Sequence, residues 1–249
     1  MNLIVLEPAD FVDEDRVRLD DRRLTHARKH LKVTPGDVLK VGLLDEQAAH
    51  GAAPSPNLGT GEVLRCDKQA LELRVQLGTS PPPASPITLA LALPRPPSLA
   101  KVLQQGTALG VKRFLLFHSK RVEKTYWQAS AMEEDQLRRQ LLLGLEQCVD
   151  TVLPVVELHP RFRPFVEDRL AEQRARGPVI VGDPYASRAW PELRAGAPLC
   201  LVLGPEGGFI DFERERFTAL GDTLVSLGPR ILRVETAAVA LLARLTPTL

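Results

Sequence analysis

The chain has 249 residues, of which 44% are hydrophobic and 25% charged, and its net charge is +1. These proportions are typical of folded globular chains and exclude a largely disordered protein. The near-zero net charge excludes a global attraction to nucleic acid or membranes, so any such affinity must come from a local patch. No apolar run approaches the ~20 residues of a membrane span. Five acidic residues before position 16 are also wrong for a signal peptide.

The three cysteines, Cys66, Cys148 and Cys200, are scattered along the chain. They show neither the paired spacing of a disulfide framework nor the spacing of metal ligands. We therefore expect a cytoplasmic protein with reduced, buried thiols and no bound metal.

The N-terminal part of the chain predicts a small β-rich barrel or sandwich. Apolar and polar residues alternate strictly over 71–77, which is typical of a half-buried strand. Asp20 or Asp21 is a suitable N-cap for a short helix that runs through Leu31. Residues 45–60, rich in Ala, Gly, Pro and Ser, predict a long loop. The predicted strands are Leu3–Leu6, Val38–Leu44, Gly61–Leu64 and Leu71–Leu77.

A proline-rich segment divides the chain, because prolines lack an N–H donor and form stiff, extended spacers. We expect one domain over residues 1–78, a linker over 79–86 and a second domain over 87–249. In the second domain, continuous apolar runs alternate with helical patterns, which predicts an α/β fold with a parallel sheet covered on both faces. The predicted strands are Ile87–Leu93, Phe114–Phe117, Val155–Leu158, Val179–Val181, Leu199–Leu203 and Thr223–Leu227. The predicted helices lie at about 98–109, 130–149 and 162–175, from Asp211 onwards, and at the C-terminal end.

A glycine-rich loop, Gly204-Pro205-Glu206-Gly207-Gly208-Phe209, directly follows the strand Leu199–Leu203. Its glycines allow backbone N–H groups to approach a ligand closely, and ligands of open parallel sheets bind beyond the carboxyl ends of the strands. The loop is neither a dinucleotide-binding motif nor a P-loop. Asp211 and Glu213 at the start of the next helix disfavour a bound phosphate. The loop therefore indicates a neutral or cationic ligand, with an unliganded β–α turn as the alternative.

The second motif runs from Leu227, at the end of the last predicted strand, to Ala237. Arg230, Arg233 and Glu235 crowd the first turns of the final helix, and residues 237–242 are all apolar. A helix that is apolar all round is buried in a core or an interface. Since unpaired buried charges are costly, the charged start of this helix must open into a cleft or form an internal Arg–Glu pair. Because both motifs follow strands, we expect them to line one pocket.

The segments Gly204–Phe209 and Arg230–Ala237 together resemble those of the bacterial 16S ribosomal RNA (uracil-N3)-methyltransferases of the SPOUT superfamily. Weaker similarities extend over nearly the whole chain. They are Leu109-Gly110-Val111, Glu146-Gln147 followed by Pro154, and His30-Leu31-Lys32-Val33 followed by Gly36-Asp37. The resemblance implies an α/β methyltransferase domain with a deep trefoil knot, a rare kind of threading, and an N-terminal PUA-like RNA-binding barrel. It also implies S-adenosylmethionine as cofactor, 16S rRNA or the small ribosomal subunit as partner, and a homodimer with the site near the subunit interface.

The resemblance further implies roles for individual residues. Arg233 would stabilise the anion that develops on uracil as N3 loses its proton, and Glu235 would orient Arg233. Glu206 or Glu235 would accept the proton, directly or through water. The residues expected to line the cofactor are Leu203, Gly204, Glu206, Gly207, Gly208, Leu227, Gly228, Ile231 and Leu232.

Residues 16–32 form a basic segment suited to RNA phosphates. Seven basic against two acidic side chains give this segment a charge of +5 before its two histidines are counted, so the rest of the chain sums to −4. A solvated helix face is the alternative. A second basic patch, Lys120–Trp127, adds Tyr126 and Trp127, on which a base could stack. The residues expected to bind RNA are Arg22, Arg23, Arg28, Lys29, Lys32 and Arg230.

Two segments depart from the family. Gln105-Gly106-Thr107-Ala108 stands where the family has Lys-Ala-Thr-Glu, and Val149-Asp150-Thr151 stands where it has an arginine that would bind phosphate. Two alternatives therefore stay open: a SPOUT methyltransferase with another RNA target, and a catalytically silent RNA-binding protein of the same fold.

Three further groups follow predicted strands directly: His118, His159 and the turn Asp183-Pro184-Tyr185. No Ser or Cys nucleophile motif accompanies the histidines, so we interpret them as structural. We interpret the Asp183 turn as a plain turn, with a place beside the cofactor as the alternative.

Overall fold

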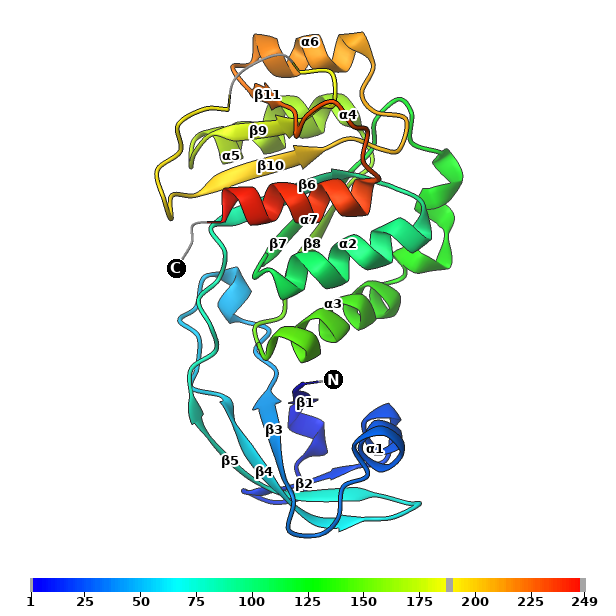
Figure 1. Cartoon of the computed structure of the whole chain (residues 1–249), viewed down its shortest axis with the longest axis vertical. Coiled ribbons are helices and arrows are strands. Elements are labelled where there is room, and N and C mark those ends of the chain that lie inside the picture. Colours follow the sequence, from blue (N-terminus) through cyan, green and yellow to red (C-terminus); the bar gives the residue numbers. More distant parts are fainter. Residues whose placement is uncertain (1, 187–189, 247–249) are drawn as a thin grey trace. The chain divides into compact units, whose positions relative to one another are not determined.

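The computed structural model describes residues 2–186 and 190–246 (Figure 1). The chain divides into two compact units. Unit 1 comprises Met1–Pro83 and Leu142–Leu153, and unit 2 comprises Ala84–Leu141 and Pro154–Leu249. The outer ends of the two predicted domains, residue 1 and residues 247–249, lie outside the described residues. No helix in the described part of the chain is long and apolar enough to cross a membrane.

Unit 2 is built on a six-stranded parallel sheet with the order β11-β9-β10-β6-β7-β8. All six predicted strands are present, and the prediction of an α/β fold with a parallel sheet is confirmed. Strand β10 lies between β9 and β6, so it separates strands that precede it in the sequence. The strands are β6 (Ile87–Ala92), β7 (Arg113–Phe117), β8 (Val155–His159), β9 (Val179–Gly182), β10 (Leu199–Leu203) and β11 (Thr223–Val225).

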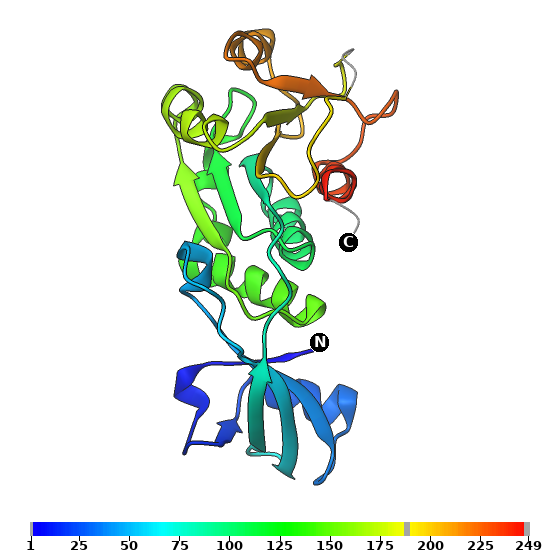
Figure 2. The same ribbon diagram turned by 90° about the vertical axis from the view of Figure 1, so that its left-hand side faces the viewer.

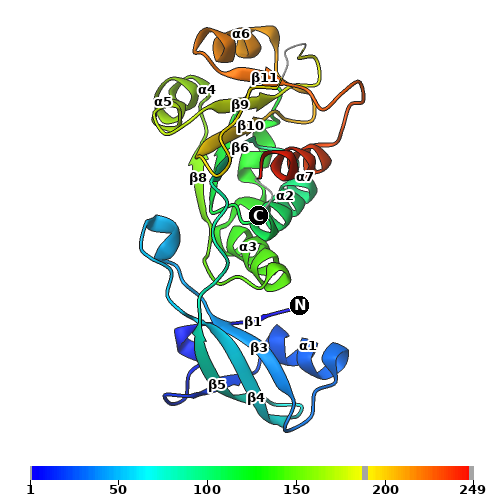
Figure 3. The ribbon, with the colours of Figure 1, turned by 60° about the vertical axis from the view of Figure 1, so that its left-hand side comes forward.

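Helices cover both faces of this sheet. Figures 2 and 3 show α2 and α7 packed together on one face, with α4 and α5 on the other. Helix α7 buries Val234, Ala238 and Leu241 among others, whereas Ala237 and Val239 are half-buried. The sequence predicted that every side of this apolar helix is buried in a core or an interface, and within this chain one side of it is only partly buried. The helices that lie wholly in unit 2 are α2 (Pro96–Ala108), α4 (Phe162–Pro164), which continues through a π-helical turn (Phe165–Arg169) into α5 (Leu170–Arg174), α6 (Asp211–Ala219) and α7 (Val234–Leu245). Helix α3 (Glu134–Cys148) belongs to unit 2 as far as Leu141.

The three thiols are free and differ in burial. Cys200 in β10 is buried, and burial raises the pKa of its thiol to about 12. Cys66 and Cys148 are only half-buried. The expectation of buried thiols is therefore right for Cys200 and wrong for the other two.

Unit 1 contains a five-stranded sheet with the order β1-β3-β4-β5-β2, in which β1 and β3 are parallel and the other pairs antiparallel. All four predicted strands are present. Strand β2 was not predicted, because it is only four residues long, which is too short for its alternation of buried Val17 and Leu19 with exposed arginines to stand out. Strand β4 begins inside the segment predicted as a loop. The strands are β1 (Ile4–Leu6), β2 (Arg16–Leu19), β3 (Val38–Leu43), β4 (Leu58–Cys66) and β5 (Leu71–Thr79).

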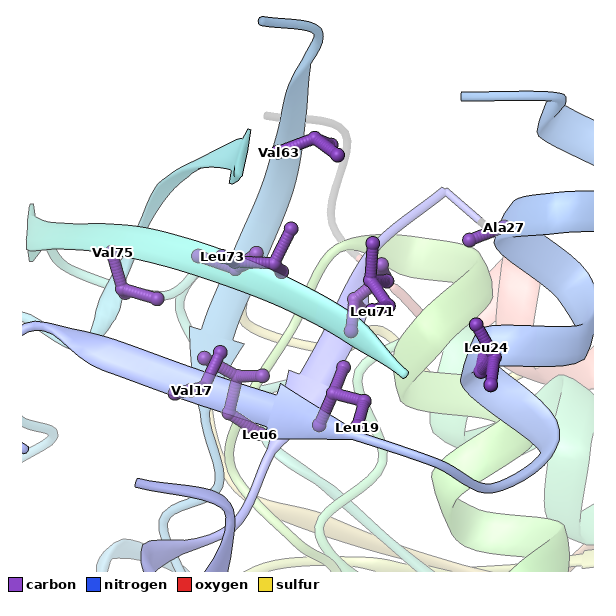
Figure 4. Close-up of a cluster of buried hydrophobic side chains, with 11 residues drawn as sticks. Leu6, Val17, Leu19, Leu24, Ala27, Val63, Leu71, Leu73 and Val75 are labelled. Carbon is purple, nitrogen blue, oxygen red and sulfur yellow. The ribbon is translucent and has the colours of Figure 1, made fainter. Parts of the chain in front are cut away.

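One hydrophobic core joins this sheet to the predicted helix. The helix consists of α1 (Arg22–His26) and a π-helical turn (Ala27–Leu31), and the Asp21 side chain caps it by accepting the N–H of Arg23 at 2.8 Å. The edge strands β1 and β2 both contribute to the same core, which is compatible with the expected barrel. Figure 4 labels its members Leu6, Val17, Leu19, Leu24, Ala27, Val63, Leu71, Leu73 and Val75.

The end of helix α3 (Glu134–Cys148) and the turn after it belong to unit 1. Glu146 is 1% exposed, and its carboxylate accepts two hydrogen bonds from the guanidinium of Arg22, at 2.9 and 2.5 Å. The Glu146 carbonyl also accepts the N–H groups of Asn2 and Leu3. This far end of α3 is therefore joined to α1 by a partly buried ion pair and to the residues just before β1 by backbone hydrogen bonds.

Asp150, where the sequence departs from the resembled family, lies in this turn. It is 2% exposed, and its carboxylate accepts the N–H groups of Thr151 and Val152 at 2.7 and 3.0 Å. The residue therefore shapes a buried turn of unit 1 at the end of α3.

Arg23 corrects another sequence-based expectation. Its side chain is 11% exposed and bonds the carboxylates of Asp10 and Asp21 as well as the carbonyl of Val5. Burial disfavours the charge, but the two carboxylates outweigh burial and raise the pKa of Arg23. All of these bonds lie within unit 1, so Arg23 is a structural residue and not part of an RNA-binding surface.

Arg23→Ala is expected to lower the free energy of unfolding by about 3 kcal/mol, because it leaves two partly buried carboxylates without their partner. Arg28→Ala, five positions further along the same helix and exposed, is the matched control and is expected to change stability by less than about 0.5 kcal/mol. Urea unfolding of both variants checks this. Equal effects of the two substitutions would contradict the structural role of Arg23.

Candidate functional site

Three loops of unit 2 meet at the carboxyl edge of the sheet: 183–186 after β9, 204–210 after β10 and 226–233 after β11. They meet because β9 lies between β10 and β11 and all three strands are parallel. Two hollows open among these loops. The larger, here called the glycine-loop hollow, encloses about 720 Å³ of empty space, open solvent included, and the second hollow about 400 Å³.

The hollows adjoin, since they share six wall residues. The glycine-loop hollow is lined by Gly182, Asp183, Pro184, Tyr185, Leu203, Gly204, Pro205, Glu206, Gly207, Gly208, Phe209, Arg214, Ile231, Leu232, Val234 and Ala237. The second hollow is lined by Gly182, Asp183, Pro184, Leu203, Val225, Ser226, Leu227, Arg230, Leu232, Ala237 and Leu241.

The structure brings eight of the nine residues predicted to line the cofactor to these two hollows. The ninth, Gly228, adjoins Leu227 in the same loop. Arg230, which was predicted to bind RNA, lines the second hollow.

The glycine loop is anchored at its end by Phe209, which is 2% exposed. The Phe209 ring lies 5.1 Å from that of Phe217 and 6.4 Å from that of Phe117, within a cluster of aromatic rings. Gly204 permits this packing, because a Cβ on it would lie 3.2 Å from the Phe209 ring. The aromatic cluster thus holds one end of the loop while its glycines face the hollow.

Two arginines from neighbouring strand ends hold the middle of the loop. The backbone N–H of Arg95, which follows β6, donates to Glu206 Oε1 at 3.1 Å, and its guanidinium lies 3.4 Å from the same oxygen. Arg121, which follows β7, donates to the carbonyl of Gly207, and its side chain packs against that glycine. Gly208 has φ +69°, a left-handed conformation that favours glycine.

The loop after β11 is held through Ser226. Its hydroxyl interacts with the carbonyls of Pro184 and Gly228, at 3.3 and 3.1 Å, and lies 3.1 Å from the Gly228 N–H. The Asp183 N–H donates to the Val225 carbonyl at 2.9 Å. The loops after β9 and β11 are therefore joined by direct hydrogen bonds, which fixes the wall they share.

The two predicted catalytic residues lie at the start of α7. Arg233 is exposed at the N-cap position, and Val234, next to it, lines the glycine-loop hollow. Glu235 bonds the hydroxyl of Ser98 and lies 3.4 Å from the ammonium of Lys101, both on α2. Its own backbone N–H, followed by these two groups, lowers the pKa of Glu235. The contacts of Glu235 therefore hold the start of α7 against α2. They involve Ser98 and Lys101, not Arg233, which Glu235 was predicted to orient.

Apolar side chains line the glycine-loop hollow and are nonetheless open to solvent. Ile231 is 72% exposed and Tyr185 is 70% exposed. Exposed apolar groups gathered around a concavity are typical of ligand or partner sites. These side chains therefore suit a ligand with apolar parts.

The basic segment of unit 1, residues 16–32, contains both basic side chains that are engaged within the protein and basic side chains that are exposed. Arg22 is engaged by Glu146 and Arg23 is buried, whereas Arg28, Lys29 and Lys32 are exposed on the π-helical turn and just after it. In the second basic patch, Lys120–Trp127, the indole N–H of Trp127 is engaged within the protein, because it donates to His118 Nδ1 at 3.1 Å. Burial lowers the pKa of His118 and that of His159, and the His159 ring packs 5.1 Å from Phe165. These contacts agree with the structural interpretation of both histidines.

Three polar residues around the hollow were not selected from the sequence: Arg214, Arg95 and Arg121. The Asp183 turn was interpreted as a plain turn, with a place beside the cofactor as the alternative, and Asp183 lines both hollows. Arg95 and Arg121 follow strand ends, but their partners lie about a hundred residues away in the sequence. Arg214 lies in the first turn of α6, where the sequence shows only a charged helix.

Residues 81–246 match the model of a protein family described as the RNA methyltransferase domain. The chain belongs to this family. The two motifs that resemble those of the 16S ribosomal RNA methyltransferases lie in the matched region and in unit 2.

Similarity to named proteins extends over nearly the whole chain. The chain is 25% identical over 244 residues to a ribosomal RNA small subunit methyltransferase E of Treponema pallidum, covering 96% of this chain and 88% of that protein. It is 28% identical over 251 residues to a protein of the same name from Synechocystis, covering 99% of this chain and 77% of that protein.

Solved structures show the same fold. A ribosomal RNA small subunit methyltransferase E from Neisseria gonorrhoeae, bound to S-adenosyl methionine, has a TM-score of 0.73 and 19% identity, covering 97% of this chain and 96% of that chain. A putative methyltransferase from Legionella pneumophila, in complex with the bound cofactor SAM, has a TM-score of 0.73 and 24% identity, covering 98% and 96%. The fold of nearly the whole chain is therefore also found in these solved structures.

Gly208→Ala is expected to lower the free energy of unfolding by about 1 to 2 kcal/mol, because an L-residue is strained at φ +69°. Gly207→Ala is the matched control in the same loop. Its added Cβ would meet only the flexible Arg121 side chain, at 3.0 Å, so we expect little change. Thermal unfolding of both variants checks this, and a larger loss in Gly207→Ala would contradict the described loop conformation.

Proposed function

We propose that this protein is an S-adenosylmethionine-dependent methyltransferase that methylates N3 of a uracil in 16S ribosomal RNA. The observation that carries the proposal is the meeting of both family motifs around one concavity in unit 2. The names of the relatives that match nearly the whole chain support the ribosomal RNA substrate. The bound cofactor of two structural neighbours supports S-adenosylmethionine.

The residues around the hollow fit S-adenosylmethionine. Gly208 leaves its side of the wall open, since a Cβ there would meet no atom within 4 Å. Exposed Ile231 and Tyr185 offer apolar surface, while buried Asp183 offers a negative charge to a cation. The cofactor supplies a methyl group carried on a positively charged sulfur. The residues proposed to hold it are Leu203, Gly204, Glu206, Gly207, Gly208, Leu227, Gly228, Ile231 and Leu232.

Arg233 is proposed as the catalytic residue that stabilises negative charge on the uracil ring. Its exposed place at the N-cap of α7, beside the glycine-loop hollow, leaves its donors available to a base. Glu235 acts as a positioning residue, because its bonds to Ser98 and Lys101 hold the first turn of α7.

Glu206 is the favoured proton acceptor, since it lines the hollow, whereas the lowered pKa of Glu235 makes that carboxylate a weaker base. The N3 edge is paired in a duplex, so the target base must be unpaired or extruded.

We propose two further features of the family for this chain, the trefoil knot and the homodimer. The insertion of β10 between β9 and β6, and the packing of α7 against α2, support the knot. The half-buried apolar residues of α7 support a second copy packed there. Light scattering coupled to size-exclusion chromatography checks the dimer, and a monomer mass would contradict it.

Nucleoside digests of ribosomal RNA from cells with and without this gene test the proposed function. The account predicts that 3-methyluridine disappears from the small-subunit RNA and returns when purified protein and S-adenosylmethionine are added. Loss of a different modified nucleoside would favour a methyltransferase with another RNA target. No change at all would favour the catalytically silent alternative.

Arg233→Ala is expected to reduce methylation by about 10²- to 10³-fold, the usual loss for one donor to a developing anion. Cofactor affinity is expected to stay nearly unchanged, because Arg233 itself does not line either hollow. Single-turnover transfer of a labelled methyl group and calorimetric titration of the cofactor give the two readouts. An unchanged transfer rate would refute the catalytic role.

The exposed basic residues of unit 1 are proposed to bind RNA phosphates. Replacing Arg28, Lys29 and Lys32 together by Ala is expected to weaken RNA binding at low salt and to reduce the slope of log affinity against log salt by about 2. The matched control removes the same charge from three other basic residues of unit 1, of which two are already paired with carboxylates: Arg65, Lys68 and Arg74. Equal losses in both triple variants would show an effect of net charge alone and contradict the patch.

A further inference from the structure

Asp183 occupies the centre of the site, at the end of β9 between the loops that carry the two motifs. The residue is 3% exposed and forms part of the wall of both hollows. Its Oδ1 accepts the N–H of Tyr185 at 2.8 Å, an Asx turn that accounts for this oxygen. The turn does not account for the other oxygen of the carboxylate.

Oδ2 of Asp183 is buried and has no hydrogen-bond partner among the residues that the structure describes. The nearest cation is Arg214, whose Nε lies 3.8 Å away. Arg214 also donates to the Phe209 carbonyl at 2.8 Å and forms an ion pair with Asp211. Two carboxylates therefore share one guanidinium, and this cluster carries a net charge of −1.

The uncompensated charge of the cluster is the buried one. Asp211 is 83% exposed, so water solvates its carboxylate, whereas the Asp183 side chain is 2% exposed. The other charged wall residues leave this charge in place: Glu206 is itself an anion, paired with Arg95, and the cation of Arg230 is exposed to water. A buried carboxylate without a full partner is costly. A cation bound in the hollow would offset that cost.

We propose that Asp183 is the counter-charge for the positively charged sulfur of the methyl donor, and that it makes the site prefer S-adenosylmethionine to its neutral-sulfur product, S-adenosylhomocysteine. The inference rests on the proposed function of the same site. A sulfonium has no hydrogen to donate, so a protein recognises it through charge. Asp183 provides that charge in a wall where water screens it little.

The same charge also favours release of the product. In the transfer, the carbon–sulfur bond breaks with its electron pair left on sulfur, and a carbon–nitrogen bond forms at uracil N3. The N3 proton passes to the carboxylate of Glu206, the proposed acceptor. The sulfur becomes neutral, and Asp183 loses its partner. The site then holds the spent product less tightly than the fresh donor.

Calorimetric titration of S-adenosylmethionine and S-adenosylhomocysteine into the wild-type chain and Asp183→Asn tests the proposal. Asn keeps the acceptor for Tyr185 and removes the charge. We expect affinity for S-adenosylmethionine to fall by about tenfold or more, with affinity for S-adenosylhomocysteine unchanged. Glu215→Gln is the matched control, because it removes an exposed carboxylate of α6 that lies outside the cluster of Asp183, Arg214 and Asp211, and it is expected to leave both affinities unchanged.

The melting temperature of the ligand-free protein is the second readout. Because the charge is uncompensated without ligand, Asp183→Asn is expected to melt at the wild-type temperature or above it. A purely structural Asp183 would give a lower melting temperature and parallel losses for both ligands, and that result would overturn the proposal. If Asp183→Asn fails to fold, Asp183→Glu takes its place in the titrations. This variant keeps the charge, so it is expected to retain the preference for S-adenosylmethionine, and loss of that preference would count against the inference.

The outcomes separate this inference from the proposed function. If the wild-type chain binds S-adenosylmethionine and Asp183→Asn leaves its preference for that ligand unchanged, the inference fails and the proposed function stands. If the wild-type chain binds no S-adenosylmethionine, the proposed function fails and the inference fails with it.

Discussion

The parallel pairing of β10, β9 and β11 is the constraint on which the site depends. Parallel neighbours bring their carboxyl ends to one edge of the sheet, so three loops far apart in the sequence share one wall. The loops are then locked by specific contacts: an aromatic cluster around Phe209, and Ser226 between the loops after β9 and β11. The open concavity follows from the glycines and from the exposed apolar side chains beside them.

Charge is used in two different ways in this molecule. Several arginines form bonds within the protein: Arg23 in unit 1 with Asp10 and Asp21, and Arg214 in unit 2 with Asp211 and the Phe209 carbonyl. Others, such as Arg28 and Arg233, are exposed. Composition counts both kinds alike, which explains why a basic segment in the sequence overstates the basic surface. Burial and partners decide which cations remain available to RNA.

Much of the fold could be predicted from the sequence because its strands are continuous apolar runs or strict alternations, and both patterns follow from local burial. The two motifs were found for a similar reason, since each combines glycine with charged residues directly after a strand. The rest depends on contacts between distant residues. Membership of 142–153 in unit 1 follows from the Arg22–Glu146 pair across 124 positions. The role argued for Asp183 depends on Arg214 and Asp211, and a plain turn has the same local sequence.

The central claim is that the loops after β9, β10 and β11 form one binding site for S-adenosylmethionine in unit 2. Hydrogen–deuterium exchange with and without S-adenosylmethionine tests it most directly. The account predicts slower exchange at backbone amides of 183–186, 204–210 and 226–233 together. Protection that omits any one of these loops, or that appears instead at the hollow beside His159 at the end of β8, would contradict the account.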